Sequence, residues 1–242
     1  MNILRTILFV VSLAVIAFLS SCGSYYYYPT QQHILKFKKK GDVTINAGMD
    51  SEWFESYGIG GSITDNIALI TNLNTFRSSS GGKYKVDDYL LEPEIVLYKK
   101  LKKNLYPAVN IGYGFGQIDR NDEDFKLSIQ RQFIQPSFGY SNDYIDVALS
   151  SRFTRANYDL SIIDENSNVR RNNDLMDLGN GDFYFFEPAI TIGAGYKFVK
   201  WRYQMIFVNK LSGGAINYVD VNRILSVNLT FNMNNIYGDK EQ

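Results

Sequence analysis

The residues of this chain that could do chemistry are few, and most of them are charges on alternate positions of strand-like segments. There is one histidine, His33, and one cysteine, Cys22. Six charged residues share the register of the small and polar positions: Glu92, Glu94, Asp146, Arg152, Lys197 and Arg202. A charge on the inside of a narrow fold is costly unless it is paired. Because acids and bases both occur there, we expect an internal salt-bridge network. The alternative is a lumen whose charges select solutes.

The remaining polar segments favour neither a metal nor a cofactor. Asp164–Asp182 is rich in Asn and Asp oxygen donors, which could hold calcium, but the spacing does not fit an EF-hand, so we expect a solvated loop. The glycines Gly112, Gly114 and Gly116 are not followed by a helical pattern, as a nucleotide-binding fingerprint would require. The 25 basic and 25 acidic residues balance, so no nucleic-acid partner is indicated.

The elements that carry these residues are strands with an apolar face and a small or neutral face. Pro188–Phe207 shows this most clearly. Its apolar register holds Ile190, Ile192, Ala194, Tyr196 and then Trp201, Tyr203, Met205 and Phe207. A soluble strand usually turns charges to water on its other face. Here that face suits the crowded interior of a closed barrel whose apolar face meets lipid.

Ten such segments follow one another between Asp42 and Tyr237, which predicts an all-β fold: an antiparallel up-and-down transmembrane β-barrel over 42–237. Eight or twelve strands would need only one hairpin to be divided differently. Long polar links, among them Arg77–Val86 and Gln117–Asp124, alternate with short ones. Outer-membrane barrels have long outer loops and short periplasmic turns, so we expect both barrel termini in the periplasm.

The N-terminus has the features of a secretory signal. Arg5 is followed by an apolar stretch, Ile7–Leu19, which is too short to span a bilayer as a helix. We therefore divide the chain into a signal peptide (1–21), a tether (22–41), the barrel and a short tail (238–242). We read His33, in the tether, as a solvated residue.

Leu19-Ser20-Ser21-Cys22 resembles the bacterial lipobox, in which the cysteine is lipidated and becomes the N-terminus after cleavage. The resemblance implies acylation of Cys22, palmitate included. A lone cysteine cannot form an internal disulfide, which is consistent with that role. Gly23 rather than Asp follows the cysteine, which by lipoprotein sorting rules permits transfer to an outer membrane. We expect membrane lipid as the partner and an anchor in the periplasmic leaflet.

The mature chain resembles the small outer-membrane β-barrel proteins of Bacteroidota, many of which carry a lipoprotein signal. The likeness rests on the lipobox, the Lys40–Asp42 entry and glycine–aromatic strands such as Ile111–Phe115. Outer-membrane barrel enzymes use a histidine near the rim as base or partner. His33 precedes the first strand, so the resemblance implies no enzyme activity. We expect a structural or interaction role, or a narrow lumen for small solutes.

A second architecture remains open at this point. A periplasmic, lipid-anchored barrel in the manner of lipocalins would bind an apolar ligand in its interior. The two architectures differ in which face is outside. In the second, one apolar set would line the cavity: Ile111, Tyr113, Phe115, Tyr203, Val227 and Leu229.

Overall fold

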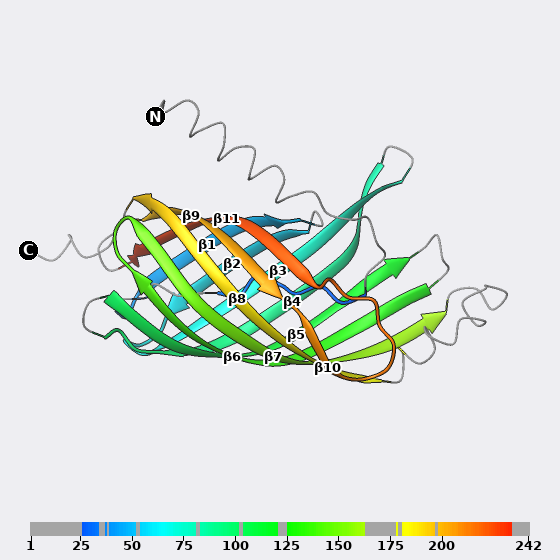
Figure 1. Ribbon diagram of the computed structural model, residues 1–242. Coiled ribbons are helices and arrows are strands. Elements are labelled where there is room, and N and C mark those ends of the chain that lie inside the picture. The colour runs from blue at the N-terminus through cyan, green and yellow to red at the C-terminus, as the bar shows by residue number, and fades with distance from the viewer. Residues whose placement is uncertain are drawn as a thin grey trace, which may run out of the picture.

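The computed structural model is a closed antiparallel β-barrel (Figure 1). It describes residues 26–33, 37, 39–51, 54–80, 83–101, 104–120, 125–162, 178, 181–196 and 198–233. The strands are β1 (Asp42–Asp50), β2 (Glu55–Ser62), β3 (Ile67–Ser80), β4 (Lys83–Tyr98), β5 (Leu105–Arg120), β6 (Phe125–Ser141), β7 (Ile145–Ile162), β8 (Asp182–Tyr196), β9 (Val199–Phe207), β10 (Asn209–Ser212) and β11 (Val221–Asn232). Because β10 continues β9 past Val208 and both pair with β8, the ring has ten strands, as predicted.

The ring closes because the first strand pairs with the last. Strand β1 pairs with β2 on one side and with β11 on the other, and β11 pairs with β9. Each strand of the ring therefore has two hydrogen-bonded neighbours, and no edge is left open. In a membrane this closure is required, since lipid offers no partner to a free backbone N–H or C=O.

The two ends of the barrel differ. Asp42 pairs with Asn232, so the first and last strands reach the same end, which we call the terminal rim. The links 63–66, 99–104, 142–144 and 197–198 also lie at this rim. The opposite end, the distal rim, carries the links 51–54, 81–82, 121–124, 163–181 and 213–220.

Two of the predicted long links are wrong, because much of Arg77–Val86 and Gln117–Asp124 is strand. Strand β3 continues to Ser80 and β5 to Arg120, and both stay paired with the next strand. Near the distal rim the outward positions become polar, as at Gln130, Arg155 and Asn157. The ladder hydrogen bonds continue there after the hydrophobic alternation has ended, so hydrophobicity alone places the strand ends too early.

The outer face of the barrel is apolar. Ile111, Tyr113 and Phe115 are 50%, 40% and 44% exposed, while the intervening positions face inward. Outward positions on the other strands continue the pattern: Ile45, Ile59, Leu69, Ile95, Ile134, Phe138, Val147, Leu149, Ile190, Ile192, Trp201, Leu225 and Leu229. The lipocalin-like alternative, in which such residues line a cavity, is therefore wrong.

Aromatic side chains lie at both borders of this apolar band. Near the terminal rim are Tyr140, Tyr144, Tyr196, Phe198 and Trp201, all of them exposed. Towards the distal rim the exposed aromatic residues are Tyr57, Tyr89, Tyr113, Phe153 and Tyr184. Two such girdles are typical of transmembrane barrels, because amphipathic rings are favoured at the membrane–water interface.

The position of the band predicts how strand β7 responds to a new charge. Leu149 lies at the centre of the apolar stretch, and Leu149→Arg should lower the free energy of unfolding by about 2–4 kcal/mol. Ser161 faces outward on the same strand beyond the band, so Ser161→Arg should change it by about 1 kcal/mol or less. Denaturant titration in phospholipid vesicles measures both. Equal losses of unfolding free energy in the two variants would contradict a lipid-facing band.

Candidate functional site: the filled lumen

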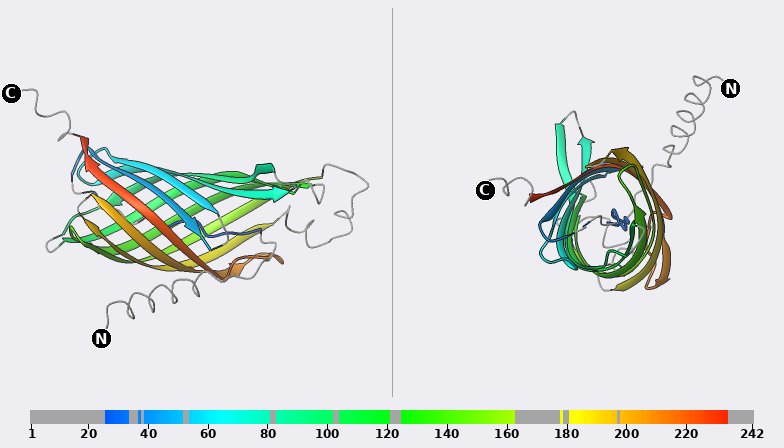
Figure 2. Two further views of the ribbon diagram at one scale, coloured as in Figure 1. Left: turned by 90° about the horizontal axis from the view of Figure 1, so that it is seen from above. Right: turned by 90° about the vertical axis from the view of Figure 1, so that its left-hand side faces the viewer.

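A segment of the chain's own N-terminal region occupies the interior of the barrel. Residues 29–33 are all buried, as are Tyr27 and Phe37. Figure 2 shows this part of the chain, in deep blue, inside the ring of strands. We call residues 26–33 together with Phe37 the lumen segment. His33 is only 3% exposed, so its predicted solvated position is wrong.

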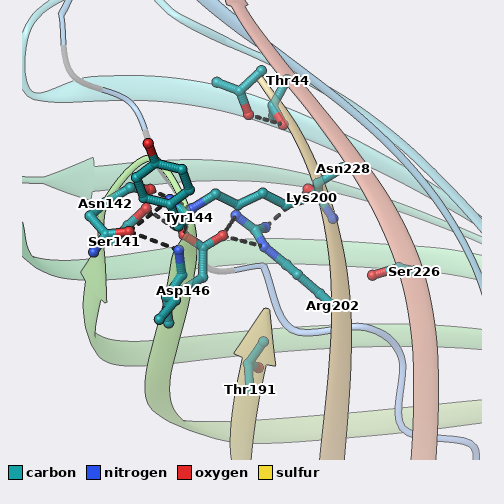
Figure 3. A network of polar contacts seen from close by, with 12 residues as sticks. Thr44, Ser141, Asn142, Tyr144, Asp146, Thr191, Lys200, Arg202, Ser226 and Asn228 are labelled. Atoms are coloured by element: carbon teal, nitrogen blue, oxygen red, sulfur yellow. Dashed lines mark hydrogen bonds and ion pairs between the residues drawn. The ribbon is translucent and has the colours of Figure 1, made fainter. Parts of the chain in front are cut away.

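One cluster of charges lies in the lumen near the terminal rim, where Asp146 projects inward from β7 (Figure 3). Its carboxylate accepts a hydrogen bond from Lys200 at 2.5 Å, and Nε and Nη2 of Arg202 donate to it at 3.0 and 2.8 Å. Ser141 donates to the same carboxylate at 2.5 Å, and Arg202 also donates to Asn228 at 3.0 Å. All of these side chains are buried, so the lost hydration of each charge is replaced by protein partners.

A second cluster, at mid-height, joins the barrel wall to the lumen segment. Thr30 donates to Glu92 at 2.6 Å and accepts from Arg152 at 2.7 Å, so one hydroxyl connects an acid on β4 with a base on β7. Arg152 also donates to the Gln135 side chain at 2.9 and 3.0 Å and to the Gln31 carbonyl at 3.3 Å. The guanidinium is thus held between the wall and the segment.

Glu94 is held by the wall alone. Asn72 on β3 and Asn110 on β5 each donate to its carboxylate at 2.7 Å, one from each side of β4. Neutral amides do not cancel the charge, but they replace part of the hydration that burial removes.

A third cluster closes the lumen towards the distal rim. The Tyr27 hydroxyl donates to Glu187, which also accepts from Thr154 at 2.8 Å. The Tyr27 ring stacks on the Phe185 ring with the two centroids 3.6 Å apart. The guanidinium of Arg131, on β6, lies 4.3 Å from the centroid of the Tyr27 ring. A cation over an aromatic face is stabilised most where both are desolvated, as they are here.

The backbone of the lumen segment is paired like that of an extra strand, but by side chains. The Gln32 N–H donates to Gln204 at 2.8 Å, and the same Gln204 amide donates back to the Gln32 carbonyl at 2.8 Å. Asn222 donates to the Pro29 carbonyl at 2.9 Å. Because a buried unpaired backbone group is costly, these inward amides explain how an irregular segment can lie inside the barrel.

The inward glycines leave room that large inward side chains occupy. A Cβ at Gly112 would overlap the ring of Phe133. The guanidinium of Arg152 lies over this ring, 4.2 Å from its centroid. A Cβ at Gly193 would lie 2.9 Å from Arg202 and 3.2 Å from Asp146. The space predicted from the small residues is therefore occupied by the charged clusters themselves.

Five of the six predicted lumen charges are buried inside the barrel: Glu92, Glu94, Asp146, Arg152 and Arg202. Among these five, a direct ion pair joins Asp146 and Arg202. The sixth, Lys197, lies outside the described residues. Sequence reasoning missed Arg131, Glu187 and Lys200.

The missed charges are in the inward register of their strands. Arg131 is in phase with Phe133 and Gln135, but near the end of the apolar band the alternation no longer marks a strand. Lys200 lies in the break of the predicted apolar register between Tyr196 and Trp201, whereas β9 already begins at Val199. Extending the alternation of β6 and β9 by one or two residues would have found both.

The interior leaves little free volume around the lumen segment. A cavity beside Tyr28, Thr30 and Arg131 has about 30 Å³, room for on the order of two waters. Within the described residues there is no group of three or more potential metal ligands, and most of the Asp164–Asp182 loop lies outside them. In the same part of the chain, no helix is long and apolar enough to cross a membrane.

Comparisons with known proteins yield similar architectures and no sequence relatives. No family model matches the chain, and no curated protein matches it. OmpTdeltaL8, a loop-deletion mutant of an outer membrane protein of Vibrio cholerae, is 9% identical, with a TM-score of 0.35 and 74% of this chain and 54% of that one covered. The chain thus spans about half the length of that protein.

Two further solved structures are similar at the same level. The N-terminal β-barrel domain of Pseudomonas aeruginosa OprF is 8% identical, with a TM-score of 0.32 and 80% and 99% coverage of the two chains. KdgM porin is 8% identical, with a TM-score of 0.36 and 78% and 99% coverage. Similarities this low carry no information about function.

The Asp146 cluster predicts a large stability effect. Asp146→Asn leaves Lys200 and Arg202 buried without their counter-charge, which should cost about 3–5 kcal/mol. The matched control is Asp182→Asn, because Arg155 and Asp182 also pair at 2.8 Å but with exposed side chains. It should change stability little. Denaturant titration in vesicles compares the two, and similar effects would show that the lumen pair is not decisive.

Proposed function

We propose that this protein is an outer-membrane β-barrel that is also anchored by a lipid on Cys22, and that its role is structural or in protein interaction rather than catalytic. The observation that carries this proposal is the apolar outer band with its two aromatic girdles around a polar interior. In water, such an exterior would expose far more apolar surface than a soluble protein usually does. The lipobox-like Leu19–Cys22 supports the anchor.

A closed lumen is favoured over a path for small solutes. Four buried carboxylates lie with four buried cations: Glu92, Glu94, Asp146 and Glu187 with Arg131, Arg152, Lys200 and Arg202. Three further buried carboxylates, Asp42, Asp50 and Asp88, accept hydrogen bonds from Asn232, Asn222 and the Asp119 N–H. Charges that are matched to one another and to the lumen segment have little capacity left to attract a passing ion.

The histidine supports a non-catalytic role. His33 is the one histidine of the chain, and it is enclosed at mid-lumen, where its carbonyl accepts from Gln135 at 3.2 Å. A general base must reach a substrate proton. A substrate could reach this imidazole only if the lumen segment left the barrel.

The shape of the rims supports an orientation. The β3–β4 and β5–β6 hairpins and the end of β7 extend past the apolar band at the distal rim, and the longest link, 163–181, is also there. Outer-membrane barrels place their long loops outside and their short turns in the periplasm. We therefore orient the distal rim towards the outside and the terminal rim, with both ends of the barrel, towards the periplasm.

Membrane location and anchoring are tested by fractionation and labelling. The mature protein should appear in outer-membrane fractions and migrate faster on gels when unheated, as a folded barrel does. Growth with an alkyne-tagged palmitate should label the wild type and not a Cys22→Ser variant. Recovery of an unlabelled wild type would reject the lipid anchor, and recovery in the soluble periplasm would reject the membrane barrel.

Conductance tests whether the lumen is closed. In planar bilayers the wild type should show no steady current. Replacing Pro29–His33 by a Gly/Ser segment of equal length keeps the backbone acceptors but removes the side chains of Thr30, Gln31 and Gln32. Their contacts with Glu92, Arg152, Ser226 and Glu187 are then lost, and stepwise currents should appear.

Two further variants distinguish an opened lumen from a misfolded barrel in the conductance test. Thr30→Val keeps the size of the side chain but removes its bonds to Glu92 and Arg152, so it should open briefly and less often. Ser161→Arg leaves the lumen unchanged and should stay closed. A steady current through the wild type, or none through the Gly/Ser variant once folded, would reject the closed lumen.

A further inference from the structure

The lumen segment enters at one rim of the barrel and leaves at the other. Phe37 lies near the terminal rim in a cluster with Ala68, Ile70, Val96, Tyr98 and Ala108, and its ring is 5.7 Å from that of Tyr98. His33 contacts the wall at mid-height. Tyr26 and Tyr27 lie at the distal rim. Residues 26–33 and Phe37 are therefore distributed along the length of the lumen.

The contacts at the distal rim are backbone hydrogen bonds. The N–H groups of Tyr26 and Tyr27 donate to the Asn217 carbonyl at 2.9 and 3.2 Å, and the Val219 N–H donates to the Tyr27 carbonyl at 3.2 Å. The Tyr158 hydroxyl donates to the Tyr26 carbonyl at 3.1 Å. Tyr26 is thus fixed to the link between β10 and β11, which belongs to the distal rim.

The contacts at the terminal rim fix the other end. The Lys40 N–H donates to the Asp65 carboxylate at 2.8 Å, and the Gly41 N–H donates to the Ser62 carbonyl at 3.0 Å. The chain then enters β1 at Asp42. Both ends of the lumen segment are therefore held by the protein, at opposite sides of the apolar band.

Chain length decides where Cys22 can lie. Cys22 lies four positions before Tyr26, and a fully extended chain spans about 3.6 Å per residue, a reach of about 14 Å. The apolar band of an outer-membrane barrel is about 25 Å tall. Even a fully extended chain from Tyr26 cannot bring Cys22 back across the band to the terminal rim.

We propose that the lumen segment threads the barrel so that the lipid on Cys22 inserts into the leaflet at the distal rim, opposite to the leaflet that the two ends of the barrel face. The lipid itself and the outward orientation of the distal rim rest on the proposed function. With that orientation the acyl chains lie in the cell-surface leaflet. The sequence-based expectation of an anchor in the periplasmic leaflet is replaced.

Threading has a consequence for the closed lumen. The lumen segment continues into β1 on one side and ends in a lipid on the other. It cannot slide out of the barrel in either direction, unlike a plug domain that is tethered at one end. The strands must also close around the segment during assembly, since the filled lumen leaves no room for acyl chains to pass.

Thiol labelling in intact cells tests the threading. The chain has a single cysteine, Cys22, whose thiol cannot react with a maleimide once it is acylated. The wild type should therefore not be labelled. Ser24→Cys reports the N-terminus, Ala215→Cys marks the distal rim and Asp143→Cys marks the terminal rim; both markers are exposed. A membrane-impermeant maleimide should label the Ser24 and Ala215 variants in intact cells, and the Asp143 variant only after the outer membrane is permeabilised.

The outcomes separate this inference from the proposed function. If the Ser24 variant, like the Asp143 variant, were labelled only after the outer membrane is permeabilised, while the Ala215 variant was labelled in intact cells, threading would be overturned. Labelling of the wild type at Cys22 would show that the protein is not acylated, which rejects the anchor. The same three markers in a Cys22→Ser background then report the path of the chain.

Photo-crosslinking gives a second readout that needs no solvent access. Benzoylphenylalanine in place of Tyr26 should crosslink to peptides from 213–220. Crosslinks to the terminal-rim links 63–66 or 142–144 would overturn the proposal.

Discussion

A polar group inside this barrel must find its partner within the protein, because a wall with an apolar outer face encloses it. That constraint explains why Asp146 lies between Lys200 and Arg202, and why Glu94 is flanked by two asparagines. It also explains the lumen segment, whose hydroxyl and carbonyls are further partners for the wall residues Arg152, Gln204 and Asn222. Wall and segment thus share one hydrogen-bond network.

The same constraint shapes what the protein can do. Its interior is neither an apolar pocket nor an open charged channel, so function is left to the two rims and the lipid-facing exterior. At the distal rim, the hairpins extend past the apolar band, and Tyr26 and Tyr27 are fixed to the link 213–220. A lumen segment that is held at both ends is suited to a fixed structural role rather than to gating.

The fold could be predicted from the sequence because it depends on a local signal. Alternation at Ile111–Phe115 and Ile190–Tyr196 identifies the outward face directly, and counting such segments yields ten strands. The alternation also placed Asp146, Arg152 and Arg202 inward. It could not reveal that Thr30 and Gln32 fill the lumen, because Pro29–His33 has no periodicity and its burial depends on distant partners such as Glu92 and Gln204. Arg131 and Lys200 were missed where the apolar alternation ends.

The central claim is that residues 26–33 form an integral part of the barrel interior. Hydrogen–deuterium exchange of this peptide, with the protein in a lipid bilayer, tests it most directly. The amides of Tyr27 and Gln32 donate to wall and link acceptors, so they should exchange as slowly as those of β5 and β7. Exchange at the rate of an unstructured peptide, while the strands stay protected, would contradict the account.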